Sequence, residues 1–191
     1  MDIRNEIRKT LSELERAITM KGCIGIKLHP TNAGYPIDGE YYNSIFHFAS
    51  DRGIPVEIHV YPRTHLADDV CSPARIKHVM AKYPQLKVSV AHLGGFQYEE
   101  LIGTNAYFNI SSILPDLESR FGIENTNTIL RKFGVDKLVF ATDYPDSRSL
   151  PAATIYDSYF EILGQMDFTQ AEAEAICKYN AQKLLGILSA N

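Results

Sequence analysis

Three polar side chains follow apolar, strand-like segments of the sequence and are the first candidates for chemistry. Asp143 ends the segment that begins at Lys137, while His59 and His92 end two other segments of the same kind. A carboxylate at the end of a buried strand is poorly solvated unless a cationic group faces it. The three strand ends therefore predict the rim of an active site. The alternative is three unrelated polar strand ends.

Strands and helices alternate along the chain, as the spacing of the apolar residues indicates. We predict strands at 23–28, 54–60, 87–92, 106–111 and 137–143. We predict helices at 1–21, 39–52, 73–83, 98–102, 124–133, 152–163 and 170–185, with Asp38, Ser72 and Thr169 as N-caps. This alternation is typical of a parallel α/β sheet.

Polar residues at the strand ends favour a (β/α) barrel, in which chemistry gathers at the carboxyl ends of the strands. A full barrel of eight units needs about 250 residues. Only five strands are visible in the 191 residues, so we predict an incomplete TIM-barrel-like fold. Neither a repeat nor a domain boundary is apparent, which predicts a single domain over residues 1–191.

Composition narrows the classes of partner. The formal net charge is −4 and the pI is about 5.9. The sequence thus lacks the excess of positive charge that binding to nucleic acid or an anionic membrane requires, and we expect a small-molecule substrate. No apolar run approaches the length of a membrane span, and the N-terminal segment is charged rather than signal-like. Three widely spaced cysteines without a CxxC motif predict reduced thiols in a cytoplasmic protein.

Five short segments resemble, in order and spacing, the C-terminal two-thirds of a known family. They are GIKLHP at 25–30, VEIH at 56–59, AHLGG at 91–95, FATDYP at 140–145 and NAQKLLG at 180–186. The chain resembles the amidohydrolase-related (amidohydrolase 2 type) family of metal-dependent hydrolases and decarboxylases. The resemblance implies that the five strands are the fourth to the eighth of a TIM barrel.

The resemblance also implies a divalent metal, with zinc as the first choice, and roles for the three polar strand ends. His59 and Asp143 would be metal ligands, and Asp143 would also accept a proton from the metal-bound water. His92 would polarise the substrate or act in acid–base chemistry. These roles agree with metal chemistry, because zinc lowers the pKa of its water to about 7 and a neutral histidine can donate to the developing oxyanion.

One feature of the family is missing, since the sequence contains no His-x-His to supply two further metal ligands. A catalytic metal normally has about three protein ligands and a water. Glu57 lies on the same strand face as His59, and Lys27 on the same face as His29. Lys27, His29 and Glu57 are therefore candidate substrate-binding residues. Glu57 is either a metal ligand or an ion-pair partner of Lys27, and His29 is either a pocket residue or a hydrogen-bonded loop residue.

The expected function is a metal-dependent hydrolase that acts on a small carboxylate, amide or lactone through a metal-activated water. One alternative is a non-oxidative decarboxylase of the same family, in which Lys27 or Arg63 would face the substrate carboxylate. Another is a non-catalytic partial barrel. An open barrel would expose the edge of the 23–28 strand and part of an apolar interior, which predicts a homodimer. His65, in the loop after the second strand, is a further pocket candidate.

Overall fold

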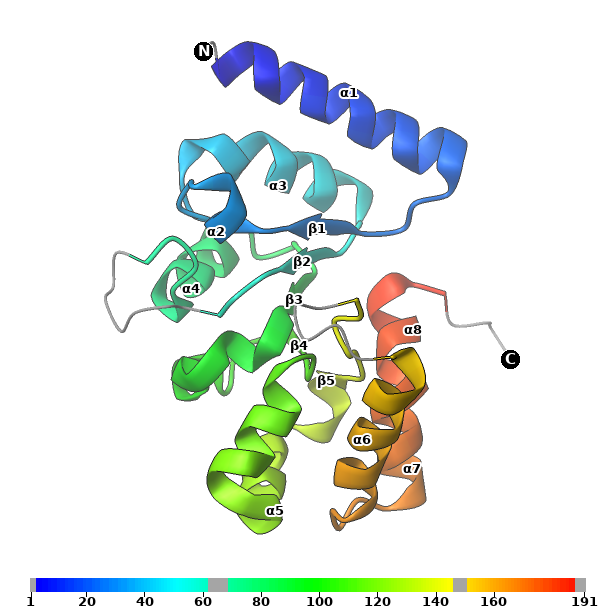
Figure 1. The fold of residues 1–191 in the computed structure, drawn as a ribbon. Coiled ribbons are helices and arrows are strands. Elements are labelled where there is room, and N and C mark those ends of the chain that lie inside the picture. The colour runs from blue at the N-terminus through cyan, green and yellow to red at the C-terminus, as the bar shows by residue number, and fades with distance from the viewer. Residues whose placement is uncertain (1–2, 62–68, 146–150, 188–191) are drawn as a thin grey trace.

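One parallel β-sheet organises the fold, and its strands lie in the order of the sequence. The computed structural model describes residues 3–61, 69–145 and 151–187. The sheet consists of β1 (Ile26–Leu28), β2 (Val56–Ile58), β3 (Val88–Val90), β4 (Tyr107–Asn109) and β5 (Leu138–Val139), shown in Figure 1. Each neighbouring pair is parallel. The prediction of five parallel strands in an α/β fold is confirmed, although each strand is shorter than predicted.

Helical segments connect the strands and cover the sheet. They are α1 (Ile3–Lys21), α2 (Pro30–Ala33), α3 (Glu40–Arg52), α4 (Pro73–Lys82), the 3₁₀ segment η1 (Ala91–Leu101), α5 (Ile113–Phe133), η2 (Val135–Lys137), α6 (Ala152–Gly164), α7 (Gln170–Glu174), the π segment η3 (Ala175–Tyr179) and α8 (Asn180–Leu185). In Figure 1, α1 lies against α3 beyond the β1 edge, α6 stands beside α7, and α8 contacts β5.

The two faces of the sheet differ in polarity, as the period of two along each strand requires. Ile26 and Leu28 of β1 are buried in the core, and so are the corresponding valine and isoleucine of β2. Lys27 and Glu57 point to the other face, where their side chains remain 42% and 38% exposed. In a closed barrel this second face is the interior, so the exposure of a charged pair there shows that the barrel is open.

The open edge differs from the sequence-based prediction in one respect. Among the described residues, β1 pairs only with β2, and β5 pairs only with β4. The inner face at the β1 edge carries the Lys27–Glu57 ion pair beside apolar side chains such as Leu184 and Leu185, so a charged pair interrupts the apolar surface that we expected. Apolar exposure near this edge comes from Met20 and Ile24, which precede the strand. Within the described part of the chain, no helix is long and apolar enough to cross a membrane.

The helix predicted at 124–133 begins much earlier, at Ile113, and forms the C-terminal half of α5. Gly122 interrupts the helix with a φ of 75°, which is why the sequence pattern became clear only after this residue. The short helix predicted at 98–102 is the end of η1, which starts at Ala91. Residues 30–33, for which we predicted neither a strand nor a helix, form α2.

Of the three predicted N-caps, Thr169 and Ser72 are confirmed in position, and Asp38 is not. Its side chain and Glu172 form a reciprocal capping box at the start of α7. The N-cap of α3 is Gly39, because the carboxylate of Asp38 accepts a hydrogen bond from Arg75 instead. Ser72 occupies the N-cap position of α4 but makes no side-chain capping bond.

Candidate active site

His59 and His92 meet at the carboxyl ends of two adjacent strands. Because Ile58 pairs with Val90 in the parallel register, the residues that follow β2 and β3 lie side by side. Nε2 of His92 lies 3.0 Å from Nδ1 of His59, with the ring planes 73° apart. The structure therefore brings together the two histidines that the sequence placed at separate strand ends.

The backbone at His92 turns sharply out of the strand. His92 and Leu93 have φ values of 60° and 54°, and Gly94 and Gly95 continue with 92° and 67°. Left-handed backbone is unfavourable for residues with a Cβ atom, so the surrounding contacts have to hold His92 in this conformation. At Gly94 a Cβ atom would lie 2.5 Å from Cδ1 of the buried Leu101, which explains a glycine at that position.

Burial controls the charge of His92, whose exposed fraction is 2%. Burial lowers the pKa of the imidazole below its usual 6.5, while the hydrogen bond to Ser111 and the negative charge of Asp143 act in the opposite direction. The net effect lowers the pKa, so the ring is neutral at pH 7. Two oxygens of Ser111 contact its Nδ1, the carbonyl at 2.8 Å and the hydroxyl at 3.0 Å.

His29 is the hydrogen-bonded loop residue of one sequence-based interpretation, and its role in a pocket stays a prediction. Its ring stacks on His59, with the centroids 3.8 Å apart and the planes 13° apart. Its Nδ1 also accepts a hydrogen bond from the backbone N–H of Asn32, at 3.3 Å, which caps the short helix α2. The ring of this hydrogen-bonded loop residue therefore covers one face of the His59 ring.

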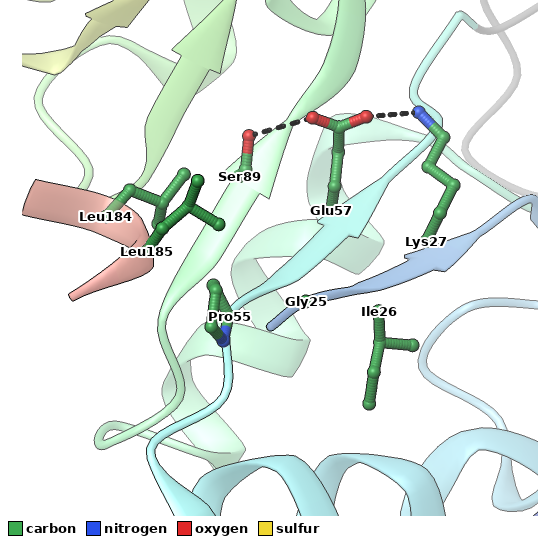
Figure 2. A pocket seen from close by; sticks show the side chains of 8 residues that line it. All are labelled: Gly25, Ile26, Lys27, Pro55, Glu57, Ser89, Leu184 and Leu185. Atoms are coloured by element: carbon green, nitrogen blue, oxygen red, sulfur yellow. Dashed lines mark hydrogen bonds and ion pairs between the residues drawn. The ribbon is translucent and has the colours of Figure 1, made fainter. Parts of the chain in front are cut away.

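Glu57 is the ion-pair partner of Lys27, as one of the two sequence-based interpretations held. Nζ of Lys27 lies 2.7 Å from Oε1 of Glu57, while Oε2 accepts from Ser89 at 3.4 Å and from Asn109 at 2.9 Å. Figure 2 shows Lys27, Glu57 and Ser89 in a row across three neighbouring strands. They line a cavity of about 210 Å³ on the inner face of the sheet, which Leu184 and Leu185 also approach.

Asp143 follows β5 and faces a different partner. Its backbone is left-handed, with a φ of 66°, and its exposed carboxylate accepts a hydrogen bond of 3.2 Å from the hydroxyl of Ser112. It lies near enough to His92 to raise the pKa of that ring by its charge. Among residues 3–61, 69–145 and 151–187, however, no group of three or more His, Cys, Asp or Glu side chains is placed to hold a metal ion.

Two residues of the site escaped the sequence analysis. Asn109 ends the strand β4 and Ser111 follows it; both are 2% exposed and form hydrogen bonds with His92. They belong to the strand predicted at 106–111, so the rule that drew attention to His59 and His92 would also have found them. Arg63 and His65, which were candidates for the pocket, lie outside the described residues.

Comparison with known proteins assigns the family. Polar residues at the carboxyl ends of successive parallel strands define an enzyme-like partial (β/α) barrel. The family model for amidohydrolase matches residues 3–187, so the chain belongs to the amidohydrolase family. A search of curated proteins finds no match.

Solved structures with the same fold are longer chains, and one of them is described as a TIM-barrel protein. A TIM-barrel protein of Bordetella bronchiseptica is 19% identical with a TM-score of 0.73, over 95% of this chain and 63% of its own. A dihydroxybenzoic acid decarboxylase of Polaromonas sp. JS666, solved with manganese and 2-nitroresorcinol, is 15% identical (TM-score 0.67, 96% and 67%). The probable 2-pyrone-4,6-dicarboxylic acid hydrolase of Acinetobacter baumannii is 16% identical (TM-score 0.66, 92% and 68%).

These likenesses establish the fold as part of a TIM barrel. The chain spans only 63–68% of the three matched structures, so its five strands account for part of a complete barrel. The two named enzymes catalyse different reactions, a decarboxylation and a hydrolysis, and the fold does not distinguish between them.

Proposed function

We propose that the chain forms the catalytic part of an amidohydrolase-family hydrolase that acts on a small carboxylate, amide or lactone. The observation that carries this proposal is the contact of 3.0 Å between His59 and His92 at adjacent strand ends, with Asp143 close enough to influence the charge of His92. Asp143 would accept the proton of the attacking water. His92 would exchange protons through Nε2, and His59 would contribute to the metal site.

The described residues do not by themselves fit the divalent metal, whether zinc or the manganese of the Polaromonas decarboxylase. Catalytic metal sites have about three protein ligands, and only two imidazole nitrogens meet in the described part of this site. The remaining ligands would have to come from outside the described residues. We therefore assign no step of the reaction to the ion.

The second candidate is a non-oxidative decarboxylase, because a dihydroxybenzoic acid decarboxylase has the same fold. Such an enzyme would hold the substrate carboxylate with a cation. Lys27 is a poor choice for this role, since its ammonium group is paired with Glu57 at 2.7 Å. Arg63, the other candidate cation, lies outside the described residues, so this pairing supports hydrolysis as our first proposal without separating the two reactions. The third candidate is a partial barrel without catalysis.

A metal analysis and two assays separate these candidates. We would purify the protein, measure its zinc and manganese by mass spectrometry, and assay hydrolysis of small lactones and amides and CO₂ release from 2,6-dihydroxybenzoate. His59→Ala and Asp143→Asn should abolish hydrolysis while the fold is retained. His47→Ala is the matched control, because His47 is an exposed histidine of α3. A protein without metal and without activity would support the non-catalytic barrel. Activity that survives both substitutions would show that the active site lies elsewhere.

We also propose a homodimer in which each chain covers the open edges of the other. The proposal is supported by the single-sided pairing of β1 and β5 among the described residues and by the exposed Met20 and Ile24 beside β1. Association would also be a route by which the site gains further ligands. Light scattering of the purified protein should give the mass of two chains, and a monodisperse monomer would count against it.

A further inference from the structure

Building on the role proposed for His92, we infer that Asn109 is a positioning residue that fixes the orientation and the tautomer of the His92 ring. The side-chain amide of Asn109 is buried at the end of β4, one strand away from β3, which His92 follows. It contacts neither His59 nor any other imidazole ring in the described hydrogen bonds. Its influence on the histidine pair therefore passes through Ser111 and through the backbone of His92.

The orientation of the Asn109 amide follows from its partners. Oδ1 faces three donors, which are the backbone N–H of His92 at 3.1 Å, the backbone N–H of Ser111 at 3.2 Å and the hydroxyl of Ser111 at 2.6 Å. Nδ2 faces the Glu57 carboxylate at 2.9 Å, which can only accept. The reversed amide would set its NH₂ group against two backbone donors and leave Glu57 facing an oxygen, so only one orientation is compatible with this site.

The direction of the next hydrogen bond is then fixed. The single hydroxyl hydrogen of Ser111 is directed to Oδ1 of Asn109. The hydroxyl oxygen can therefore only accept from Nδ1 of His92, which lies 3.0 Å away. The carbonyl oxygen of Ser111, 2.8 Å from the same nitrogen, is also an acceptor. Nδ1 of His92 must carry a hydrogen.

This assignment changes the role expected for His92. With the hydrogen on Nδ1, the neutral ring has its lone pair on Nε2, and this atom faces Nδ1 of His59 at 3.0 Å. The neutral ring of His92 therefore accepts a proton or binds a cation through Nε2. It cannot donate from Nε2 to a developing oxyanion, which is what the family resemblance had suggested.

Glu57 and Lys27 complete the network on the inner face of the sheet. Glu57 is the acceptor that holds the NH₂ group of Asn109, and Lys27 compensates the charge of Glu57 across the β1–β2 pair. The connected hydrogen bonds begin at Lys27 on β1 and end at His59 after β2, and pass in turn through Glu57, Asn109, Ser111 and His92. This explains why the Glu57 carboxylate lies on the inner face of the sheet yet, within the part of the chain that the structure describes, belongs to no metal-ligand group with the histidines.

Nitrogen NMR of histidine-labelled protein tests the inference without requiring activity. Long-range ¹H–¹⁵N spectra distinguish the two neutral tautomers, and His92 of the unmodified protein should show hydrogen on Nδ1. Asn109→Leu frees the Ser111 hydroxyl to donate to the ring, while the Ser111 carbonyl still accepts from Nδ1. A minor but measurable fraction with hydrogen on Nε2 should therefore appear. Asn180→Leu is the matched control, because Asn180 is another buried asparagine whose amide contacts β5 and no histidine. An unchanged tautomer in Asn109→Leu would overturn the inference.

A second pair of variants decides the matter even where Asn109→Leu does not fold. Asn109→Asp places a carboxylate against Glu57 and should lower the unfolding midpoint. Adding Glu57→Gln lets the NH₂ group of the new glutamine donate to the new aspartate, which reverses the direction of the original hydrogen bond. The double variant should therefore recover most of the lost stability and keep the hydrogen on Nδ1 of His92. A double variant as unstable as the single one would overturn the network. Because neither measurement uses turnover, absence of hydrolase activity would refute only the proposed function.

Discussion

The most direct test of the fold is the replacement of Asn180 by leucine. Asn180 begins α8, is 5% exposed, and its NH₂ group donates to the carbonyl oxygens of Val135 at 2.8 Å and Leu138 at 2.7 Å. It therefore joins α8 to the start of β5. Leucine has the same branching and the same number of side-chain heavy atoms as asparagine but is bulkier, so Asn180→Leu removes the two donors without opening a cavity.

The expected loss of stability can be worked from these two hydrogen bonds. The Val135 carbonyl also accepts from the backbone N–H of Leu138, so it retains a partner in the variant. A lost hydrogen bond of this kind costs about 1 kcal/mol, and a buried carbonyl left without its donor costs about 1–3 kcal/mol. We therefore expect Asn180→Leu to lower the free energy of unfolding by about 2–4 kcal/mol.

Urea denaturation followed by circular dichroism measures this difference. Asn125→Ala is the control, since Asn125 is exposed on α5 and its amide makes one bond of 2.9 Å to the carbonyl of Phe121. The control should change the free energy of unfolding by less than about 0.5 kcal/mol. A loss below about 1 kcal/mol for Asn180→Leu would show that α8 does not depend on these bonds for its attachment to β5.

Two further predictions concern the backbone and the charge network. Gly94→Ala should lower the free energy of unfolding by about 2–4 kcal/mol, because it adds left-handed strain and a Cβ atom 2.5 Å from Leu101. Gly103→Ala adds only the strain at a φ of 83° and should cost about 1–2 kcal/mol, so equal losses in urea denaturation would contradict the steric part. Burial raises the pKa of Asp38, but hydrogen bonds from His78 and Arg75 outweigh it and hold the pKa below 3.8. This carboxylate stabilises the fold above pH 3.8, and its contribution is lost as the pH falls through the lowered pKa. Asp38→Asn should therefore reduce stability at pH 7 by roughly 1–2 kcal/mol, with a difference from the unmodified protein that shrinks below pH 3.8; a difference independent of pH would refute this assignment.

The sequence located the strands well because their signal is local. Alternating burial on β1 and β2 follows from the period of two, and the apolar runs around Val56 and Val88 needed no distant contact to be recognised. The first half of α5 was missed for the same reason. Its continuation across Gly122 depends on packing, and leucines such as Leu114 and Leu117 are buried in the common core.

Sequence also determined which residues could carry the chemistry, since His59, His92 and Asp143 could be named from strand ends alone. Tertiary structure decided how they combine. The parallel register of β2 and β3 sets two imidazole nitrogens 3.0 Å apart, while Asp143 turns to Ser112. The carbonyl of Ser111 and, through the Ser111 hydroxyl, the buried amide of Asn109 then decide which nitrogen of His92 carries the hydrogen. The position of this hydrogen depends on donors and acceptors that belong to strands far apart in the sequence. Only the tertiary structure, which brings these groups together, could determine it.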